Sequence, residues 1–243
     1  MDISVFDNSY DDAIANLESV MSSTISWHID KQSGIELSEQ INDISDNELE
    51  NVAHALATQL IATSTEQQWH IASAESLTGG LLADAFVSVA GASAVFLGSA
   101  VTYDIRAKAQ VLGVEKSLLK QAGAVNAPVA CQMAQCTARL YGQSCVEDAD
   151  FSWERLIGLS TTGVAGPGPD GILPAGLVYI GANIPVALLG DTNMRRFNMI
   201  GVNVSASNEL NIACQLRLDG NRERIRKASA AAILQYVTQL TMR

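Results

Sequence analysis

The spacing of apolar residues switches between two periods along the chain, and this alternation predicts a layered α/β domain. Around residues 52–61, apolar side chains recur every three or four positions, which is the spacing of one helix face. Shorter runs at 69–74 and 156–161 have the length of buried strands, and each is followed closely by a glycine-containing turn. Helical periodicity returns at 222–240.

Strands and helices are expected to alternate through most of the chain. The expected strands are 69–74, 94–103, 156–161, 177–182, 186–189 and a stretch near 197–204. The expected helices are one from residue 45 to about 61, 81–89, a segment containing Lys108, 127–140 and 222–240. The consecutive strands after residue 177 indicate that part of the sheet is antiparallel. We therefore predict a three-layer α/β/α sandwich with a mixed, mostly parallel sheet.

The first 46 residues follow a different pattern, rich in Asp, Ser, Asn and Ile and weakly periodic. Residues 1–50 contain twelve acidic side chains and the single basic residue Lys31, whereas residues 51–243 carry equal numbers of acidic and basic residues. The whole formal charge of −11 therefore belongs to the N-terminal part. We predict an acidic, solvated and mobile extension at 1–46, followed by one domain at 47–243.

Composition also limits the class of function. No stretch offers the basic stripe that a nucleic-acid surface requires, so nucleic-acid binding is not expected. The chain begins without a signal-peptide pattern and has no apolar run of about 18 residues, which favours a cytoplasmic protein without a membrane span. The four cysteines form no CxxC pair and the three histidines no HxxxH pair, so neither a metal site nor a cofactor is expected.

Two stretches at expected strand ends could form a nucleophile and its base. Ser76 follows one strand and precedes Thr78, Gly79 and Gly80, where free backbone N–H groups at a helix start could bind an oxyanion. Tyr103 and Lys108 follow the next strand, and a desolvated lysine with a depressed pKa can deprotonate a serine without any histidine. Taken singly, a capped turn and an exposed helix lysine explain the same residues.

Two further stretches could line a ligand. Thr162 and Gly163 open a Gly/Pro-rich loop whose N–H groups could face a small molecule. Arg222 and Arg226 stand at the start of the last helix, where basic side chains oppose the helix dipole and cost stability. A phosphate bound there would offset that cost through bidentate contacts. An ordinary connection and solvated surface charge are the alternative interpretations.

In this order, the stretches resemble the CinA C-terminal domain family, also known as the nicotinamide mononucleotide deamidases. That family typically reads AESxTGG, VTYSNxAK, GAVS, TGIAGPGG and finally a G-D-R-x-x-V-R helix. The counterparts here are residues 74–80, 101–108, 123–126, 162–168 and 220–226. The resemblance covers about 48–240. It departs from the family pattern at Asp104, Ile105, Ala122, Asn126 and Leu173.

The resemblance implies hydrolysis of the carboxamide of nicotinamide mononucleotide to nicotinic acid mononucleotide and ammonia. It gives Ser76 the role of nucleophile, with assistance from Tyr103 and Lys108. The residues expected to bind the nucleotide are Thr78, Gly79, Gly80, Thr162, Gly163, Arg222 and Arg226. It also makes a homodimer plausible.

Two other functions fit the same residues. One is a catalytically silent protein that binds pyridine nucleotides as a sensor or regulator, which the altered pocket positions and the acidic extension favour. The other is amide hydrolysis of a different small substrate. Release of ammonia from nicotinamide mononucleotide separates the first function from an active amidohydrolase.

Overall fold

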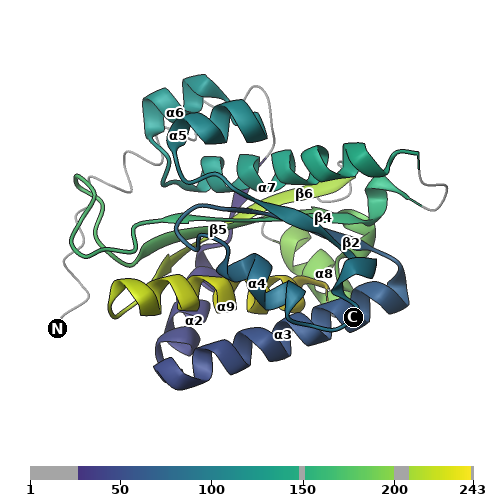
Figure 1. Cartoon of the computed structure of the whole chain (residues 1–243), viewed down its shortest axis with the longest axis horizontal. Helices are drawn as coiled ribbons and strands as arrows, with labels where there is room; N and C mark the ends of the chain where they lie inside the picture. The colour runs from purple at the N-terminus through teal and green to yellow at the C-terminus, as the bar shows by residue number, and fades with distance from the viewer. Residues whose placement is uncertain (1–26, 148–150, 200–207, 242–243) are drawn as a thin grey trace.

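A computed structural model describes residues 27–147, 151–199 and 208–241, and it has the predicted three layers (Figure 1). The central sheet of the described residues has the strand order β1-β6-β5-β4-β2-β3. Its strands are β1 (His28–Ile29), β2 (His70–Glu75), β3 (Phe96–Val101), β4 (Leu156–Gly163), β5 (Leu177–Pro185) and β6 (Glu209–Arg217). β5 runs antiparallel to both neighbours and every other pair is parallel, which confirms the mixed, mostly parallel sheet.

Helices cover both faces of the sheet (Figure 1). One face carries α5 (Ile105–Ala107), a π-helical turn η2 (Lys108–Leu112), α6 (Lys116–Ala122) and α7 (Ala127–Gly142). The other carries α2 (Lys31–Asn42), α3 (Asp46–Gln67), α4 (Leu81–Val87), α8 (Asp191–Met199) and α9 (Arg222–Thr241). Within the described part of the chain, no helix is both long enough and apolar enough to cross a membrane.

Small residues let α7 lie directly on the sheet. A Cβ atom on Gly158 of β4 would come within 2.0 Å of the Ala134 carbonyl oxygen, and one on Gly181 of β5 within 2.5 Å of the Ala130 carbonyl oxygen. Both contacts are far too short for any side chain. The scarcity of large rings and the abundance of alanine and glycine therefore serve close helix-on-sheet packing.

The second half of the expected N-terminal extension is part of the domain. β1 pairs in parallel with β6, with His28 opposite Ile212. α2 buries Leu37 and Ile41 almost completely, and Asp30 caps this helix by accepting a hydrogen bond from the Ser33 N–H. This packing was not predicted from the sequence, because the acidic composition of residues 1–46 indicated a solvated segment. Residues 1–26 of the predicted extension lie outside the described part of the chain.

The region after β5 also differs from the expectation. The expected strand at 186–189 is a 3₁₀ turn, η5 (Val186–Leu188), and residues 191–199 form α8 instead of the start of another strand. Phe197 is fully buried on this helix and Met194, three residues earlier, packs against the same core. That spacing suits a helix face rather than a strand. Residues 200–204 lie outside the described residues, and the last strand is β6.

If α2 belongs to the cooperative fold, a buried leucine on it must contribute to global stability. We expect Leu37→Ala to lower the free energy of unfolding by about 2–5 kcal/mol, because the side chain is only 1% exposed. Ile35→Ala on the same helix is the control: Ile35 is 57% exposed, and its loss should change stability by less than about 0.5 kcal/mol. Urea denaturation of the full chain measures both. Equal effects would mean that α2 unfolds independently.

Candidate active site

Three parallel strands bring the candidate residues to one edge of the sheet. Glu75, the last residue of β2, lies opposite Val101 of β3 and Thr161 of β4. The register continues past the strand ends, since the Ser76 N–H donates to the Thr161 carbonyl at 3.0 Å and the Thr102 N–H to the Glu75 carbonyl at 2.9 Å. Ligands of open α/β sheets bind at such carboxyl ends of strands.

Ser76 and Lys108 meet at this edge. The Lys108 Nζ atom lies 2.8 Å from the Ser76 Oγ atom, 2.6 Å from the Thr102 carbonyl oxygen and 3.4 Å from the Tyr103 carbonyl oxygen. Lys108 is completely buried and Ser76 is 8% exposed. Lys108 opens the π-helical turn η2, and such turns are frequent at functional sites.

Burial lowers the pKa of the Lys108 amine from 10.5 to about 8, because the charged form loses its hydration. The negative charge of Asp104 opposes this shift and raises the pKa in part. Asp104 does not pair with Lys108, because its carboxylate accepts two hydrogen bonds from the Arg106 side chain at 2.7 and 2.9 Å. An appreciable fraction of Lys108 is therefore neutral near neutral pH.

The ammonium form of Lys108 donates hydrogen bonds to Ser76 Oγ and to two backbone carbonyl oxygens, and the same partners can also accommodate the neutral amine. A neutral amine has two N–H groups and one lone pair. The Thr102 and Tyr103 carbonyl oxygens can only accept hydrogen bonds, so they take the two N–H groups. The lone pair is then left for the Ser76 hydroxyl proton. This arrangement can generate a serine nucleophile without histidine.

Glu75 organises the turn that follows β2. Its carboxylate is fully buried and accepts hydrogen bonds from the backbone N–H groups of Gly80, Leu82 and Ala83 at 2.8, 3.1 and 2.9 Å. The Ser99 hydroxyl donates to the same carboxylate at 2.9 Å. Our sequence analysis gave Glu75 no role. A carboxylate just before a helix start was the available signal, because it complements the helix dipole.

The predicted binding residues of this turn have mostly internal partners. The Thr78 hydroxyl is buried and bonds both the Glu75 carboxylate and the Thr161 hydroxyl at 2.8 Å. The Gly80 N–H is used by Glu75. Gly79 and Gly80 have φ values of 58° and 103°, a conformation that favours glycine, so they shape the turn through the backbone.

Thr162 and Gly163 lie at the same edge as Ser76 but support the loop that follows β4. The Thr162 side chain is 1% exposed and donates to the Ala124 carbonyl at 2.7 Å. Gly163 pairs with Val178, and a Cβ atom on it would come within 2.7 Å of the Leu177 carbonyl oxygen. A ligand can therefore contact the backbone groups of this loop, but not the buried Thr162 side chain.

Arg222 and Arg226, the two arginines of α9 that were expected to bind the nucleotide, have different partners. Arg222 is exposed and donates to the Gly166 carbonyl at 2.6 Å and to the Tyr103 hydroxyl at 3.3 Å. Arg226 is half-buried and donates to the carbonyl oxygens of Leu77 and Thr78. Arg226 therefore belongs to the Ser76 turn, and Arg222 is the guanidinium that faces solvent.

Tyr103 is placed differently from the expectation. Its side chain is 63% exposed, and within the described residues its phenol is hydrogen-bonded to Arg222 and to neither Ser76 nor Lys108. The Tyr103 backbone carbonyl, not the phenol, approaches the lysine amine. Sequence spacing could not predict whether the phenol or the backbone carbonyl of Tyr103 would lie near the amine.

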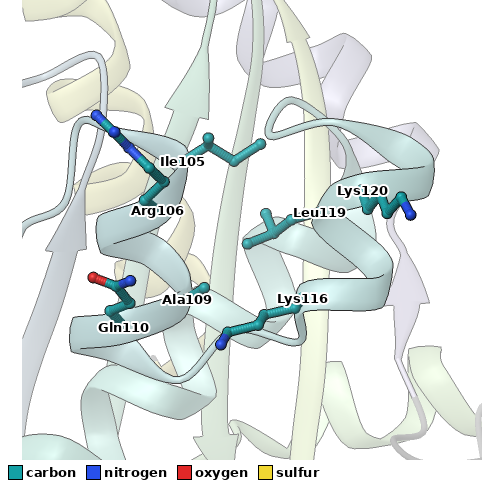
Figure 2. Close-up of a pocket in the computed structure, with 7 residues that line it drawn as sticks. All are labelled: Ile105, Arg106, Ala109, Gln110, Lys116, Leu119 and Lys120. Carbon is teal, nitrogen blue, oxygen red and sulfur yellow. The ribbon is translucent and has the colours of Figure 1, made fainter.

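A pocket of about 250 Å³ lies beside this site, between the α5–η2 segment and α6 (Figure 2). It is lined by Ile105, Arg106, Ala109, Gln110, Lys116, Leu119 and Lys120. The lining includes neither Ser76 nor Lys108. In the described residues, no group of three or more His, Cys, Asp or Glu side chains is arranged to hold a metal ion.

The fold and the site define a class: an α/β/α sandwich with a buried serine–lysine pair at the carboxyl end of its parallel strands. The family model of the CinA C-terminal domain matches residues 53–201. The chain therefore belongs to the CinA C-terminal domain family.

Known relatives agree with this assignment. A competence-damage inducible protein of Clostridium acetobutylicum is 39% identical over 166 residues, which cover 68% of this chain and 35% of that protein. A CinA-like protein of Frankia casuarinae is 34% identical over 196 residues, covering 81% of this chain and 36% of that protein. This chain thus spans about a third of the length of these relatives.

A solved structure also has this fold. The crystal structure of the competence/damage inducible protein CihA from Agrobacterium tumefaciens superposes with a TM-score of 0.60 at 28% sequence identity. The superposition covers 79% of this chain and 96% of that one.

The environment of Lys108 can be tested without any substrate. We expect its side-chain carbon resonances to titrate with a midpoint near pH 8, about two units below surface lysines, because burial disfavours the ammonium. NMR of ¹³C-lysine-labelled protein measures this, with Lys108→Met to assign the signal. A midpoint close to 10.5 would contradict the desolvated site.

Proposed function

We propose that this chain hydrolyses the carboxamide of nicotinamide mononucleotide to nicotinic acid mononucleotide and ammonia, with Ser76 as nucleophile and Lys108 as general base. One observation carries the proposal: the buried Lys108 amine lies 2.8 Å from the Ser76 hydroxyl. Membership of the CinA C-terminal domain family supports it.

The proposed reaction has two halves. Neutral Lys108 takes the Ser76 proton while Oγ attacks the amide carbon, and backbone N–H groups stabilise the resulting oxyanion. The C–N bond then breaks, the Lys108 ammonium returns its proton to the leaving nitrogen, and ammonia departs. In the second half, Lys108 deprotonates a water molecule that attacks the acyl ester; the bond from the acyl carbon to Oγ breaks, and the Lys108 ammonium returns its proton to Ser76.

Arg222 is our candidate for the phosphate of the nucleotide. Its guanidinium is exposed at the edge that carries Ser76, and it can offer a bidentate contact to an anion. Arg226 is a weaker candidate because it is half-buried and donates to two backbone carbonyls of the Ser76 turn. We assign Tyr103 to the substrate-covering surface next to Arg222, because its exposed phenol bonds that arginine.

Removal of either member of the pair should abolish ammonia release from nicotinamide mononucleotide. We expect Ser76→Ala and Lys108→Met each to lower kcat by at least about 10³-fold, as the two groups act as one unit. Lys116→Met is the matched control, because this exposed lysine lines the neighbouring pocket (Figure 2), and Ser76 is not among the residues that line it. A Ser76→Ala variant with full turnover would refute the mechanism. Tight nucleotide binding without turnover in the wild type would refute the enzymatic function.

The pH dependence should report the same lysine. Lys108 acts as a base only when neutral, and its pKa is about 8, so kcat/KM should rise with pH through an inflection near 8 and level off above it. Asp104→Asn should move the inflection to lower pH, because the Asp104 charge raises the lysine pKa. A pH–rate profile of both proteins measures this. A shift to higher pH in the variant would contradict the assignment.

A further inference from the structure

Two charged side chains hold the Ser76 turn from opposite ends. Arg226 donates from Nε to the Leu77 carbonyl at 2.9 Å and from Nη2 to the Thr78 carbonyl at 2.8 Å. Glu75 takes the backbone N–H groups that begin α4, starting with that of Gly80. The peptide units between these anchors are fixed in orientation from both sides.

This anchoring fixes the direction of two backbone N–H groups of the turn, those of Thr78 and Gly79. In a trans peptide unit the C=O and N–H bonds point in opposite directions, and the units after Leu77 and Thr78 are both trans. Because Arg226 binds these two carbonyls, the N–H groups of Thr78 and Gly79 point away from it. Within the described residues, neither N–H has a hydrogen-bond partner. Backbone donors in such a turn normally find one.

We propose that Glu75 and Arg226 are positioning residues that present the N–H groups of Thr78 and Gly79 to the oxyanion formed when Ser76 attacks. This inference rests on the proposed function of Ser76. Gly80 is excluded as a donor because its N–H binds the Glu75 carboxylate. That carboxylate also offsets the positive end of α4, so the oxyanion depends on the two local donors rather than on the helix dipole.

Gly79 connects the two anchors. Its φ of 58° lies in the left-handed region, and a Cβ atom on it would lie 3.3 Å from the Arg226 Nη2 atom. The turn thus approaches the guanidinium closely on one side while its N–H groups face the other.

The role predicts a specific kinetic signature. Burial and the Asp104 charge set the pKa of Lys108, and neither depends on Glu75 or Arg226. Loss of a positioning residue should therefore lower kcat and leave the pH of the inflection unchanged. KM should change little, because the donors act on charge that develops only in the transition state.

Arg226→Lys and Glu75→Gln test the inference. Lysine cannot hold two carbonyls in a fixed fork, and glutamine would place an NH₂ group against a backbone N–H, because both Glu75 oxygens accept from such groups. We expect kcat to fall by about 10- to 100-fold, with KM changed by less than about 3-fold.

Arg224→Lys is the matched control. Arg224 lies two residues before Arg226 on α9 and donates to the carbonyls of Asn42 and Ile44, away from Ser76. The same chemical change there should lower stability and leave kcat unaltered. Hydrogen exchange gives a second readout: amides of residues 77–83 should exchange faster in both test variants and at the wild-type rate in the control.

Three results would overturn the inference. The first is a fall in kcat no larger than that of Arg224→Lys. The second is a shift of the pH inflection, which would mean that Lys108 had been disturbed instead. The third is an unchanged rate of hydrogen exchange at residues 77–83 in Arg226→Lys. This variant conserves the charge, so it still tests the inference if Glu75→Gln fails to fold.

A covalent probe separates this inference from the choice of substrate. If the wild type releases no ammonia from nicotinamide mononucleotide, the rate at which a fluorophosphonate labels Ser76 is measured in place of kcat. The Ser76 Oγ–phosphorus bond forms, the phosphorus–fluorine bond breaks, Lys108 takes the hydroxyl proton and fluoride leaves. The phosphoryl oxygen needs the same donors, so intact mass should show slower labelling of both test variants than of Arg224→Lys. No labelling of the wild type would overturn the inference together with the nucleophile.

Discussion

The burial of one amine determines how this site is built. Burial removes the hydration of a lysine side chain, and this loss destabilises the charged ammonium more than the neutral amine. Lys108 is completely buried. Within the described part of the chain, its hydrogen-bond partners are two backbone carbonyls and one hydroxyl, and no carboxylate contacts the amine directly. A contacting carboxylate would hold the proton on the amine. The adjacent Asp104 is instead paired with Arg106, so a negative charge lies near the site without being paired to the Lys108 amine.

The sheet makes this burial feasible. β2, β3 and β4 are parallel, so each delivers its following residue to the same edge, and α5 with η2 returns the lysine over that edge. α7 covers the same face at the contact distance that Gly158 and Gly181 permit. Among the described residues, the hydrogen-bond partners of the amine are two backbone carbonyls and the Ser76 hydroxyl.

Much of the fold and part of the site could be predicted from the sequence. The position of Ser76 was predicted from a strand, a turn with two glycines and a helix. The position of Lys108 was predicted from its place in the helical segment that follows the expected strand at 94–103. What the side chains contact could not be predicted. Arg226 and Arg222 have identical chemistry and lie four residues apart, yet Arg226 is half-buried against the Ser76 turn, whereas Arg222 is exposed.

The remaining errors, at α2 and at Tyr103, have separate physical causes. α2 contacts β6 through Gly34 and Ser38, and a Cβ atom on Gly34 would come within 2.4 Å of the Gln215 carbonyl oxygen. A helix face made of small and polar residues gives only a weak hydrophobic period, so composition alone indicated a solvated segment. The Tyr103 phenol was misplaced because spacing locates a residue and not its rotamer.

The helix α9 has a consequence that reaches beyond the site. Arg224 fastens it to the junction of α2 and α3, and Arg226, a little over half a turn later, fastens it to the Ser76 turn. One rigid element is thus shared between the N-terminal packing and the nucleophile. A substitution at the junction of α2 and α3 that displaced α9 would therefore also move the Arg226 guanidinium away from the Ser76 turn.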